Sequence, residues 1–176
     1  ITCSALHPSG ETLLTINALG MVHYFDLPNM TTRDAFKLSP HTTNVKFSPD
    51  GKYFAVITKE DKLFEAGTNS LQVWNFDQKQ KWIGKNLGIR FSNSLAFHPY
   101  KNILAFAKTD TVIEVFDYKL NDVLHEIELN SDIRSITFNP NGGYLYCATD
   151  NVIQVFKVND WNLTSKYYAS SSAVVV

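Results

Sequence analysis

The twelve residues from Val45 to Val56, VKFSPDGKYFAV, predict two short strands joined by a tight turn. Val45 and Phe47 alternate with polar residues, and the Ser-Pro-Asp-Gly sequence that follows contains the residue types that turns favour. Proline fixes its own φ, an Asp side chain accepts bonds from nearby amides, and glycine adopts a positive φ easily. The residues after Lys52 are aromatic, β-branched or small, as in a buried strand.

Three other segments repeat this pattern, so the unit of strand, turn and strand occurs four times. The copies are ITCSALHPSGETLLTI from Ile1, SNSLAFHPYKNILAFA from Ser92 and IRSITFNPNGGYLYCA from Ile133. The turn prolines are separated by 41, 50 and 41 positions, which is the range expected for a four-stranded propeller blade. These prolines are Pro8, Pro49, Pro99 and Pro140.

Each unit continues with two more predicted strands. The third strand alternates and ends in an aromatic residue, which is Phe25, Trp74, Phe116 or Phe156. The second unit carries about eight extra residues within the charged segment Lys59 to Asn69, which we expect to be an exposed loop. A weaker fourth strand follows in each unit, predicted at Arg33 to Leu38, Lys81 to Ile83, Val123 to Leu129 and Leu163 to Ala169.

The second strands predict that both faces of each sheet are covered. In the segment Ile103 to Ala107, the two alanines lie on one face, while Leu104 and Phe106 lie on the other. One face is therefore small and the opposite face is large, and both are apolar. This pattern is expected for a sheet packed between two neighbouring sheets, where bulky residues of one meet small residues of the next.

We therefore predict an all-β fold of four β-propeller blades, each with four antiparallel strands, that forms part of a larger ring. A closed four-bladed ring is the alternative. Because the sequence begins inside a predicted strand without a methionine, we expect it to be a piece of a longer protein. The predicted blades are residues 1–41, 42–88 with the inserted loop 59–69, 89–131 and 132–169, and residues 170–176 form a tail or open a further strand.

The composition excludes several classes of protein. Of 176 residues, 44% are hydrophobic and the net charge is -1, so the chain is too apolar for disorder. The net charge does not indicate a nucleic-acid or membrane partner, although a local basic patch is not excluded. No apolar run is long enough to span a bilayer. We expect Cys3 and Cys147 to be buried free thiols, which favours an intracellular, cytoplasmic or nuclear location.

The residues that follow each turn resemble the WD-repeat β-propeller family over about 170 residues of the chain. The pattern D-x-x-I-x-V-F-D occurs as Asp110 to Asp117 and, with a final lysine, as Asp150 to Lys157. In the family, a loop Asp bonds a His of a Gly-His pair, and the repeats usually end in Trp-Asp. Both of these features are missing from all four units, so we expect the blades to depend mainly on apolar packing.

The resemblance implies a non-catalytic scaffold that binds other proteins of a multi-subunit assembly. Residues 1–58 also resemble the periodic tryptophan proteins of the small-subunit processome, which implies ribosome biogenesis with RNA contacts. The last unit, followed by Trp161, is similar to the katanin regulatory subunits, which implies a microtubule-associated role. A fourth alternative is a propeller hydrolase with acidic or histidine side chains converging on the central channel.

No residues of the chain form a recognisable catalytic, metal or cofactor motif, so we predict none of these sites. His7 and His98 precede turn prolines, which favours a turn-capping role. We expect the turn and loop residues to be structural: Pro8, Pro49, Asp50, Gly51, Pro99, Asp110, Pro140, Gly142 and Asp150.

The candidate partner-binding residues lie in the inserted loop and on the predicted fourth strand of the second unit. They are Lys59, Glu60, Asp61, Lys62, Phe64, Lys81 and Trp82. A basic and aromatic cluster between Lys79 and Phe91 is the nearest approach to an RNA-binding patch, although a solvated outer strand explains it better.

Overall fold

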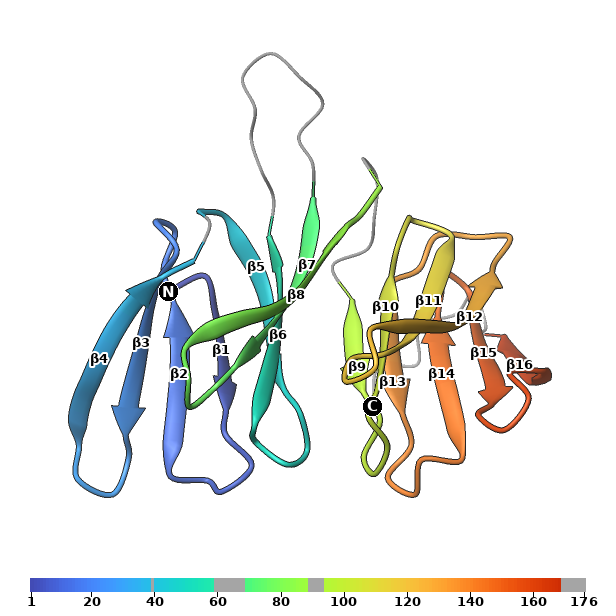
Figure 1. The fold of residues 1–176 in the computed structure, drawn as a ribbon. Coiled ribbons are helices and arrows are strands. Elements are labelled where there is room, and N and C mark those ends of the chain that lie inside the picture. The colour runs from blue at the N-terminus through green and yellow to red at the C-terminus, as the bar shows by residue number, and fades with distance from the viewer. Residues whose placement is uncertain (39, 59–68, 89–93, 169–176) are drawn as a thin grey trace, which may run out of the picture.

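The computed structural model describes residues 1–38, 40–58, 69–88 and 94–168, and all of its regular elements are strands. The strands form four separate antiparallel sheets of four strands each (Figure 1). Within every sheet the strands follow chain order, because each strand pairs with the next one along the sequence. This arrangement confirms the predicted blades of four antiparallel strands, and we number the sheets as blades 1 to 4.

The strands have the following bounds. Blade 1 contains β1 (Cys3–Leu6), β2 (Thr12–Ile16), β3 (Met21–Asp26) and β4 (Thr31–Lys37). Blade 2 contains β5 (Thr42–Phe47), β6 (Tyr53–Thr58), β7 (Ser70–Asn75) and β8 (Gln80–Asn86). Blade 3 contains β9 (Leu95–Phe97), β10 (Ile103–Ala107), β11 (Val112–Asp117) and β12 (Asp122–Glu128). Blade 4 contains β13 (Ser135–Phe138), β14 (Tyr144–Ala148), β15 (Val152–Lys157) and β16 (Leu163–Tyr168).

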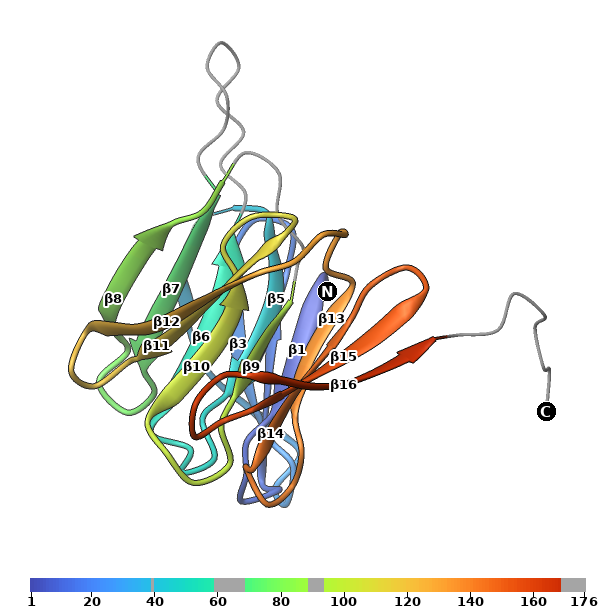
Figure 2. The same cartoon turned by 90° about the vertical axis from the view of Figure 1, so that its right-hand side faces the viewer.

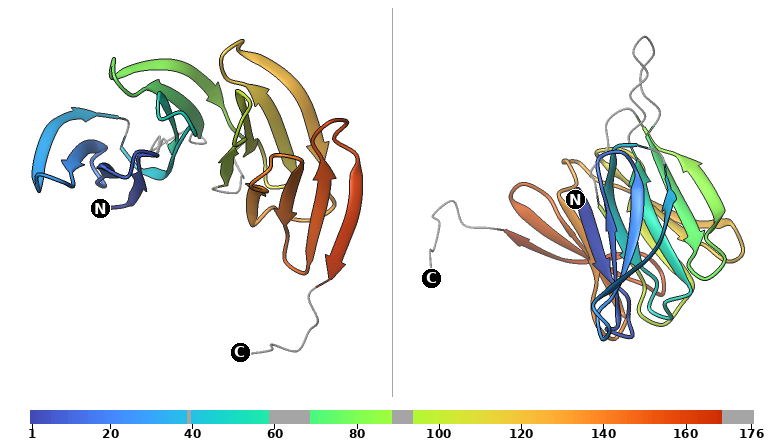
Figure 3. Two further views of the ribbon diagram at one scale, coloured as in Figure 1. Left: turned by 90° about the horizontal axis from the view of Figure 1, so that it is seen from below. Right: turned by 90° about the vertical axis from the view of Figure 1, so that its left-hand side faces the viewer.

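The four blades are arranged as an open arc. Seen from below, the first strands of the blades lie on the inner side of the arc, and the fourth strands lie on the outer side (Figure 3). Blades 1 and 4 are its two ends and lie apart in the described part of the chain. The turns between first and second strands gather at one end of the molecule, at the bottom in Figures 1 and 2.

The outer strands are bent by an irregularity that all four blades share. The register between third and fourth strands shifts at Val22/Tyr24, Val73/Trp74, Val115/Phe116 and Val155/Phe156. A bulge at this place increases the local twist and turns the exposed edge away from flat pairing. The outer strand of blade 2, β8, covers seven residues, so the prediction of Lys81 to Ile83 was too short.

The sheets pack face to face through three apolar clusters, with large side chains against small ones. Ala55 and Val73 of blade 2 pack against Leu104, Phe106 and Phe116 of blade 3. The opposite face of blade 3, which carries its alanines, packs against Ile136, Leu145 and Phe156 of blade 4. The third cluster lies between blades 1 and 2. It joins the face of blade 1 around Leu14 and Ile16 to Phe54 and Val56 of blade 2. The prediction that both sheet faces are covered is therefore confirmed for blades 2 and 3.

The turns at the bottom of the molecule form as their residue types predict. In blade 2, the Gly51 amide donates to the Ser48 carbonyl oxygen at 2.9 Å, and the Tyr53 amide donates to Ser48 Oγ at 3.0 Å. In blade 3, His98 Nδ1 accepts bonds from the Tyr100 and Lys101 amides at 3.0 and 2.9 Å. A different side chain thus caps the same turn in each of these blades.

Candidate functional site

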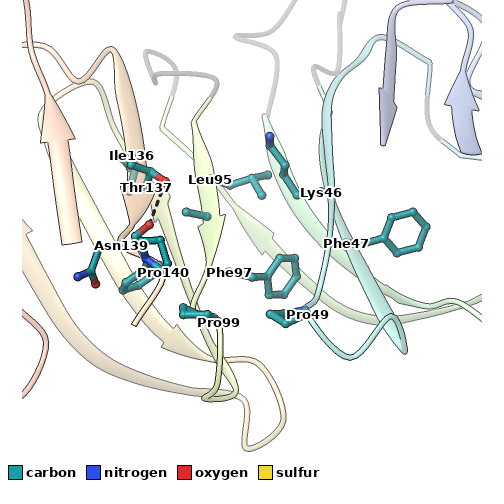
Figure 4. A pocket seen from close by; sticks show the side chains of 12 residues that line it. Lys46, Phe47, Pro49, Leu95, Phe97, Pro99, Ile136, Thr137, Asn139 and Pro140 are labelled. Carbon is teal, nitrogen blue, oxygen red and sulfur yellow. Dashed lines mark hydrogen bonds between the residues drawn. The ribbon is translucent and has the colours of Figure 1, made fainter. Parts of the chain in front are cut away.

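A hollow of about 370 Å³ opens where the inner strands β5, β9 and β13 face the inside of the arc (Figure 4). Three of the four turn prolines line it, namely Pro49, Pro99 and Pro140. Figure 4 shows the Phe97 ring directed from β9 toward Pro49. The twelve residues that line the hollow come from blades 2, 3 and 4, because each inner strand contributes its last residues and the turn that follows them. The volume lies in the range of ligand-binding pockets.

The lining of the hollow is mainly apolar, with one charged side chain. Lys46 is exposed, and its side chain forms no ion pair within the described part of the chain. On the opposite wall, β13 contributes the exposed hydroxyl of Thr137, and Asn139 follows it in the turn. The hollow thus offers an apolar surface with one cation on one side and polar groups on the other.

The described residues that line this hollow form no acid–base pair, because they include no Asp, Glu, His, Cys or Ser. The described residues also contain no group of three or more His, Cys, Asp or Glu side chains that could hold a metal ion. Threonine is the only hydroxyl-bearing residue of the lining, and no base accompanies it there. The arrangement can therefore bind a ligand but supplies no nucleophile with its activating partner.

A smaller hollow of about 110 Å³ lies between the turns of blades 2 and 3 and contains both Asp50 and His98. His98 is buried, and Nε2 faces the Gly142 carbonyl oxygen at 2.9 Å. Because Nδ1 accepts two amide bonds, Nε2 must carry the proton and donate it. Burial lowers the pKa of His98, so the ring stays neutral. Both nitrogens are already bonded, and the imidazole cannot act as a general base without breaking the turn.

The predicted partner-binding residues fall into two groups. Lys59, Glu60, Asp61, Lys62 and Phe64 lie outside the described residues. Lys81 and Trp82 lie on β8, the outer strand of blade 2, away from the hollow. Trp82 is 52% exposed, and its Nε1 donates to the Tyr118 carbonyl oxygen of blade 3 at 2.9 Å. This indole therefore links two blades and still presents half of its surface to solvent.

The basic and aromatic cluster predicted near β8 does not form one patch in the described structure. Lys85 is directed into the interface with blade 3, where its ammonium pairs with the buried Glu114 and lies 3.9 Å from the centre of the Phe116 ring. Lys79 instead lies over the ring of Tyr24 in blade 1. Arg90 and Phe91 lie outside the described residues. Lys79 and Lys85 are thus engaged in directions that differ.

The predicted turn and loop residues lie at the following places. Pro8, Pro49, Pro99 and Pro140 follow directly after the residue that caps each turn between first and second strands, and Asp50 accepts the Ser48 hydroxyl at 2.6 Å. Asp110 follows β10, and its carbonyl oxygen accepts the Ile133 amide at 2.7 Å, which joins blades 3 and 4. Asp150 accepts a 2.5 Å bond from Arg134 Nε, and this bond lowers the pKa of the Asp150 carboxyl. Gly51 and Gly142 each contact a histidine of the preceding blade.

Sequence reasoning missed the residues that line the hollow. Lys46 and Phe97 were assigned only to inner strands, because alternation shows which face of a sheet a residue occupies but not which strands converge. One signal was available. Lys46 is a charged residue between Val45 and Phe47, at a position that the other units fill with Ala5, Ala96 and Thr137.

Both cysteines are free, in agreement with the sequence prediction, but only Cys147 is fully buried and Cys3 is half-buried. Burial raises the pKa of the Cys147 thiol to about 12, so this group remains protonated and unreactive. Among the described residues, none lies in a helix that could cross a membrane.

Comparison with known proteins gives one family and several relatives. Residues 45–141, which are 97 of the 176 residues, match the family described as the anaphase-promoting complex subunit 4 WD40 domain. Cleavage stimulation factor subunit 50 of Arabidopsis thaliana is 31% identical over 134 residues, which cover 70% of this chain and 31% of the relative. Pre-mRNA-processing factor 19 of Dictyostelium discoideum is 29% identical over 166 residues, which cover 89% of this chain and 30% of the relative.

A third relative is the small ribosomal subunit protein RACK1 of Candida albicans, 27% identical over 73 residues, which cover 42% of this chain and 23% of the relative. The chain thus spans less than a third of the length of each of these curated relatives.

Proposed function

The chain belongs to the WD40-repeat family, and from this premise we propose that it is a non-catalytic scaffold that binds other proteins within a larger intracellular assembly. The observation that carries the proposal is the hollow at β5, β9 and β13, which presents an apolar surface and the exposed ammonium of Lys46. Rigid blades hold its walls, because three apolar clusters fix each sheet against the next. A rigid frame that carries a concave apolar site is well suited to binding a peptide segment.

Two features support a binding role over a hydrolase. The described lining of the hollow contains no acid, histidine or serine, and His98, in the turn that follows β9, uses both ring nitrogens to hold the fold. The names of the relatives refer to cleavage stimulation, pre-mRNA processing and a ribosomal subunit. These names favour a location inside the cell, cytoplasmic or nuclear, for this protein. They also favour a partner that is part of a multi-component assembly.

Assignments to one assembly remain predictions. The likenesses to the small-subunit processome proteins and to the katanin regulatory subunits rest on residues shared by many blades. For RNA contacts, the structure offers no specific support near β8, since the Lys85 ammonium is held by Glu114. Protein binding at the hollow is therefore the function that the geometry supports best.

The proposal is tested by selecting peptides from a random displayed library on the purified chain and measuring their affinity by calorimetry. Lys46→Glu reverses the charge of the hollow, and Thr137→Arg fills it from an exposed position on β13. Each change should lower the affinity for the selected peptides at least about tenfold, which corresponds to about 1.4 kcal/mol of binding free energy. Lys37→Glu, an exposed charge reversal on β4, should leave the affinity unchanged.

A library that yields no binding peptide would contradict the proposal, and so would peptides that bind Lys46→Glu and Thr137→Arg as tightly as the wild type. RNA that binds the chain with a steep salt dependence, and that competes with no peptide, would favour the ribosome-biogenesis alternative instead.

A further inference from the structure

The turn between β13 and β14 in blade 4 contains an asparagine followed directly by a glycine. Asn141 is the only asparagine of the chain that precedes a glycine, which is Gly142. A glycine has no β-carbon, so its amide nitrogen can approach the side chain of the preceding residue without steric hindrance. In such a pair, this nitrogen can attack the side-chain amide carbon of the asparagine.

The reaction that starts in this way consumes only water. The Gly142 nitrogen forms a bond to Asn141 Cγ and loses its proton, while the bond between Cγ and Nδ2 breaks and ammonia leaves with that proton. Water then opens the cyclic imide. Attack of water at the side-chain carbonyl gives aspartate. Attack at the main-chain carbonyl gives isoaspartate, in which the chain runs through Cβ and Cγ and the α-carboxylate is free.

Hydrogen bonds within the turn hold the reacting groups away from this geometry. The Gly142 amide donates to the Asn139 carbonyl oxygen at 2.9 Å. Asn141 Oδ1 accepts bonds from the Gly143 amide at 2.9 Å and from Asn139 Nδ2 at 2.7 Å. Because the Gly142 nitrogen and the Asn141 side chain are both held by other partners, attack requires that the turn first opens locally.

The neighbouring blade also keeps this turn closed. His98 Nε2 donates to the Gly142 carbonyl oxygen at 2.9 Å, and a β-carbon on Gly142 would be 2.4 Å from His98 Cε1. Gly142 is buried against this ring, whereas Asn141 is exposed to water. The attacking nitrogen is thus restrained by the junction of blades 3 and 4, while the side chain that loses ammonia is accessible to solvent.

We propose that Asn141 is a site of spontaneous deamidation and that the contact between His98 and Gly142 limits its rate in the folded chain. The product keeps the junction from closing again, because isoaspartate adds one methylene to the main chain directly before Gly142. Gly142 has a positive φ of 71° and lies too close to His98 for even a β-carbon, so a displaced backbone does not fit there. The modification needs no partner and is independent of peptide binding at the hollow.

The site is tested by incubating the purified chain at pH 7.5 and following its proteolytic peptides by mass spectrometry. Deamidation replaces the side-chain NH2 by OH, and chromatography separates the aspartate and isoaspartate peptides. Asn102 and Asn151 are internal controls, because both are exposed but precede the β-branched residues Ile103 and Val152, which hinder the same attack. We expect product at Asn141 well before either control, and none at this position in Asn141→Gln.

The role of the junction is tested with His98→Asn. In the folded state, this variant should deamidate at Asn141 at least about threefold faster than the wild type, because losing one hydrogen bond raises the population of the open turn by about that factor. In concentrated guanidinium chloride, both chains should react at the same rate, since the sequence around Asn141 is unchanged. Circular dichroism shows that the variant is folded.

A further measurement does not depend on the folding of His98→Asn. The aged wild-type chain carries an additional negative charge, so anion exchange separates it from the unmodified chain. Its midpoint of urea denaturation should be lower than that of the fresh chain. An Asn141→Gln chain that is aged in the same way should keep its midpoint.

Three results would overturn the proposal. The first is a folded wild-type chain in which Asn141 reacts no faster than Asn102 and Asn151. The second is a folded His98→Asn chain that deamidates at the wild-type rate. The third is an aged, deamidated chain that unfolds at the same urea concentration as the fresh chain.

Discussion

The junctions between blades 3 and 4 and between blades 2 and 3 join similar sheets by different chemistry. Between blades 3 and 4, the His98 imidazole is packed over Gly142 and donates to its carbonyl oxygen. Between blades 2 and 3, the Tyr118 ring is buried and packs edge-on against Tyr53. The ammonium of Lys85 pairs with Glu114 across the same interface. One junction thus depends on close backbone approach, and the other on a buried ion pair.

The comparison shows that equivalent positions in a repeat are not interchangeable. Gly51, Lys101 and Gly142 occupy the same position of the turn in blades 2, 3 and 4. A residue is suitable at this position only if it fits the side chain that the preceding blade presents there. The apolar clusters of the two junctions are alike, so the differences in stability between them should come from the turn and from the charges. Three measurements can break or sharpen this distinction.

The largest effect is expected from Gly142→Ala. The new β-carbon would lie 2.4 Å from His98 Cε1 at a φ of 71°, so it adds overpacking to an unfavourable backbone conformation. We expect the free energy of unfolding to fall by about 3 kcal/mol, measured by urea denaturation.

Gly10→Ala is its matched control. Gly10 has a similar φ of 77°, but no atom lies within 4 Å of the new β-carbon. Only the backbone cost remains, which is about 1 kcal/mol. If the two variants lost equal stability, close approach of the ring would not distinguish the junction of blades 3 and 4.

Glu114→Gln should have the next largest effect, at the junction of blades 2 and 3. Glu114 is 4% exposed and pairs with both Lys85 and Lys108, so its removal leaves the Lys85 ammonium at the interface without its anion. We expect a loss of about 2 kcal/mol in the free energy of unfolding, less than for a fully buried pair because both lysines are partly solvated.

Glu126→Gln is the control for this charge change. Glu126 pairs with the same Lys108 at 2.5 Å, but its side chain is 49% exposed. Removing this charge should lower the free energy of unfolding by at most about 0.5 kcal/mol. This difference from the wild type should vanish in about 1 M salt, where exposed pairs are screened. A Glu114→Gln variant that behaved in the same way would show that the ion pair does not stabilise this junction.

Of the three junction variants, His98→Asn should have the smallest effect. It removes the bond to Gly142 and should cost about 1 kcal/mol at pH 7.5. The pKa of His98 is lowered by burial, so the unfolded chain binds this proton more readily than the folded chain. The stability from neutral His98 is therefore complete above its ordinary pKa of 6.5 and is lost as the pH falls below that value.

The pH dependence provides the measurement. In the wild type, the free energy of unfolding should decrease as the pH is lowered from 7.5 to 5.5. The slope of this free energy against pH should be smaller in His98→Asn. An unchanged slope would mean that His98 is not the group whose protonation opens the junction of blades 3 and 4.

The sequence alone determined the sheets and their order along the chain. Turn chemistry around Pro49 and alternation in strands such as Ile103 to Ala107 act over a few residues, so each blade could be predicted from its own segment. The large and small faces of β10 also predicted that both faces of the sheet would be covered, because a difference in size is visible in the pattern itself.

Only the tertiary structure decided how the turns meet and where the hollow lies. His98 and Gly142 are 44 positions apart, and neither residue type indicates the other until the blades are placed side by side. Lys46, Phe97 and Thr137 line one hollow although they belong to three different blades. Local patterns fix the direction of each side chain within its own sheet. The separation and rotation between sheets depend on the packing of all of them together, and these decide which residues come into contact.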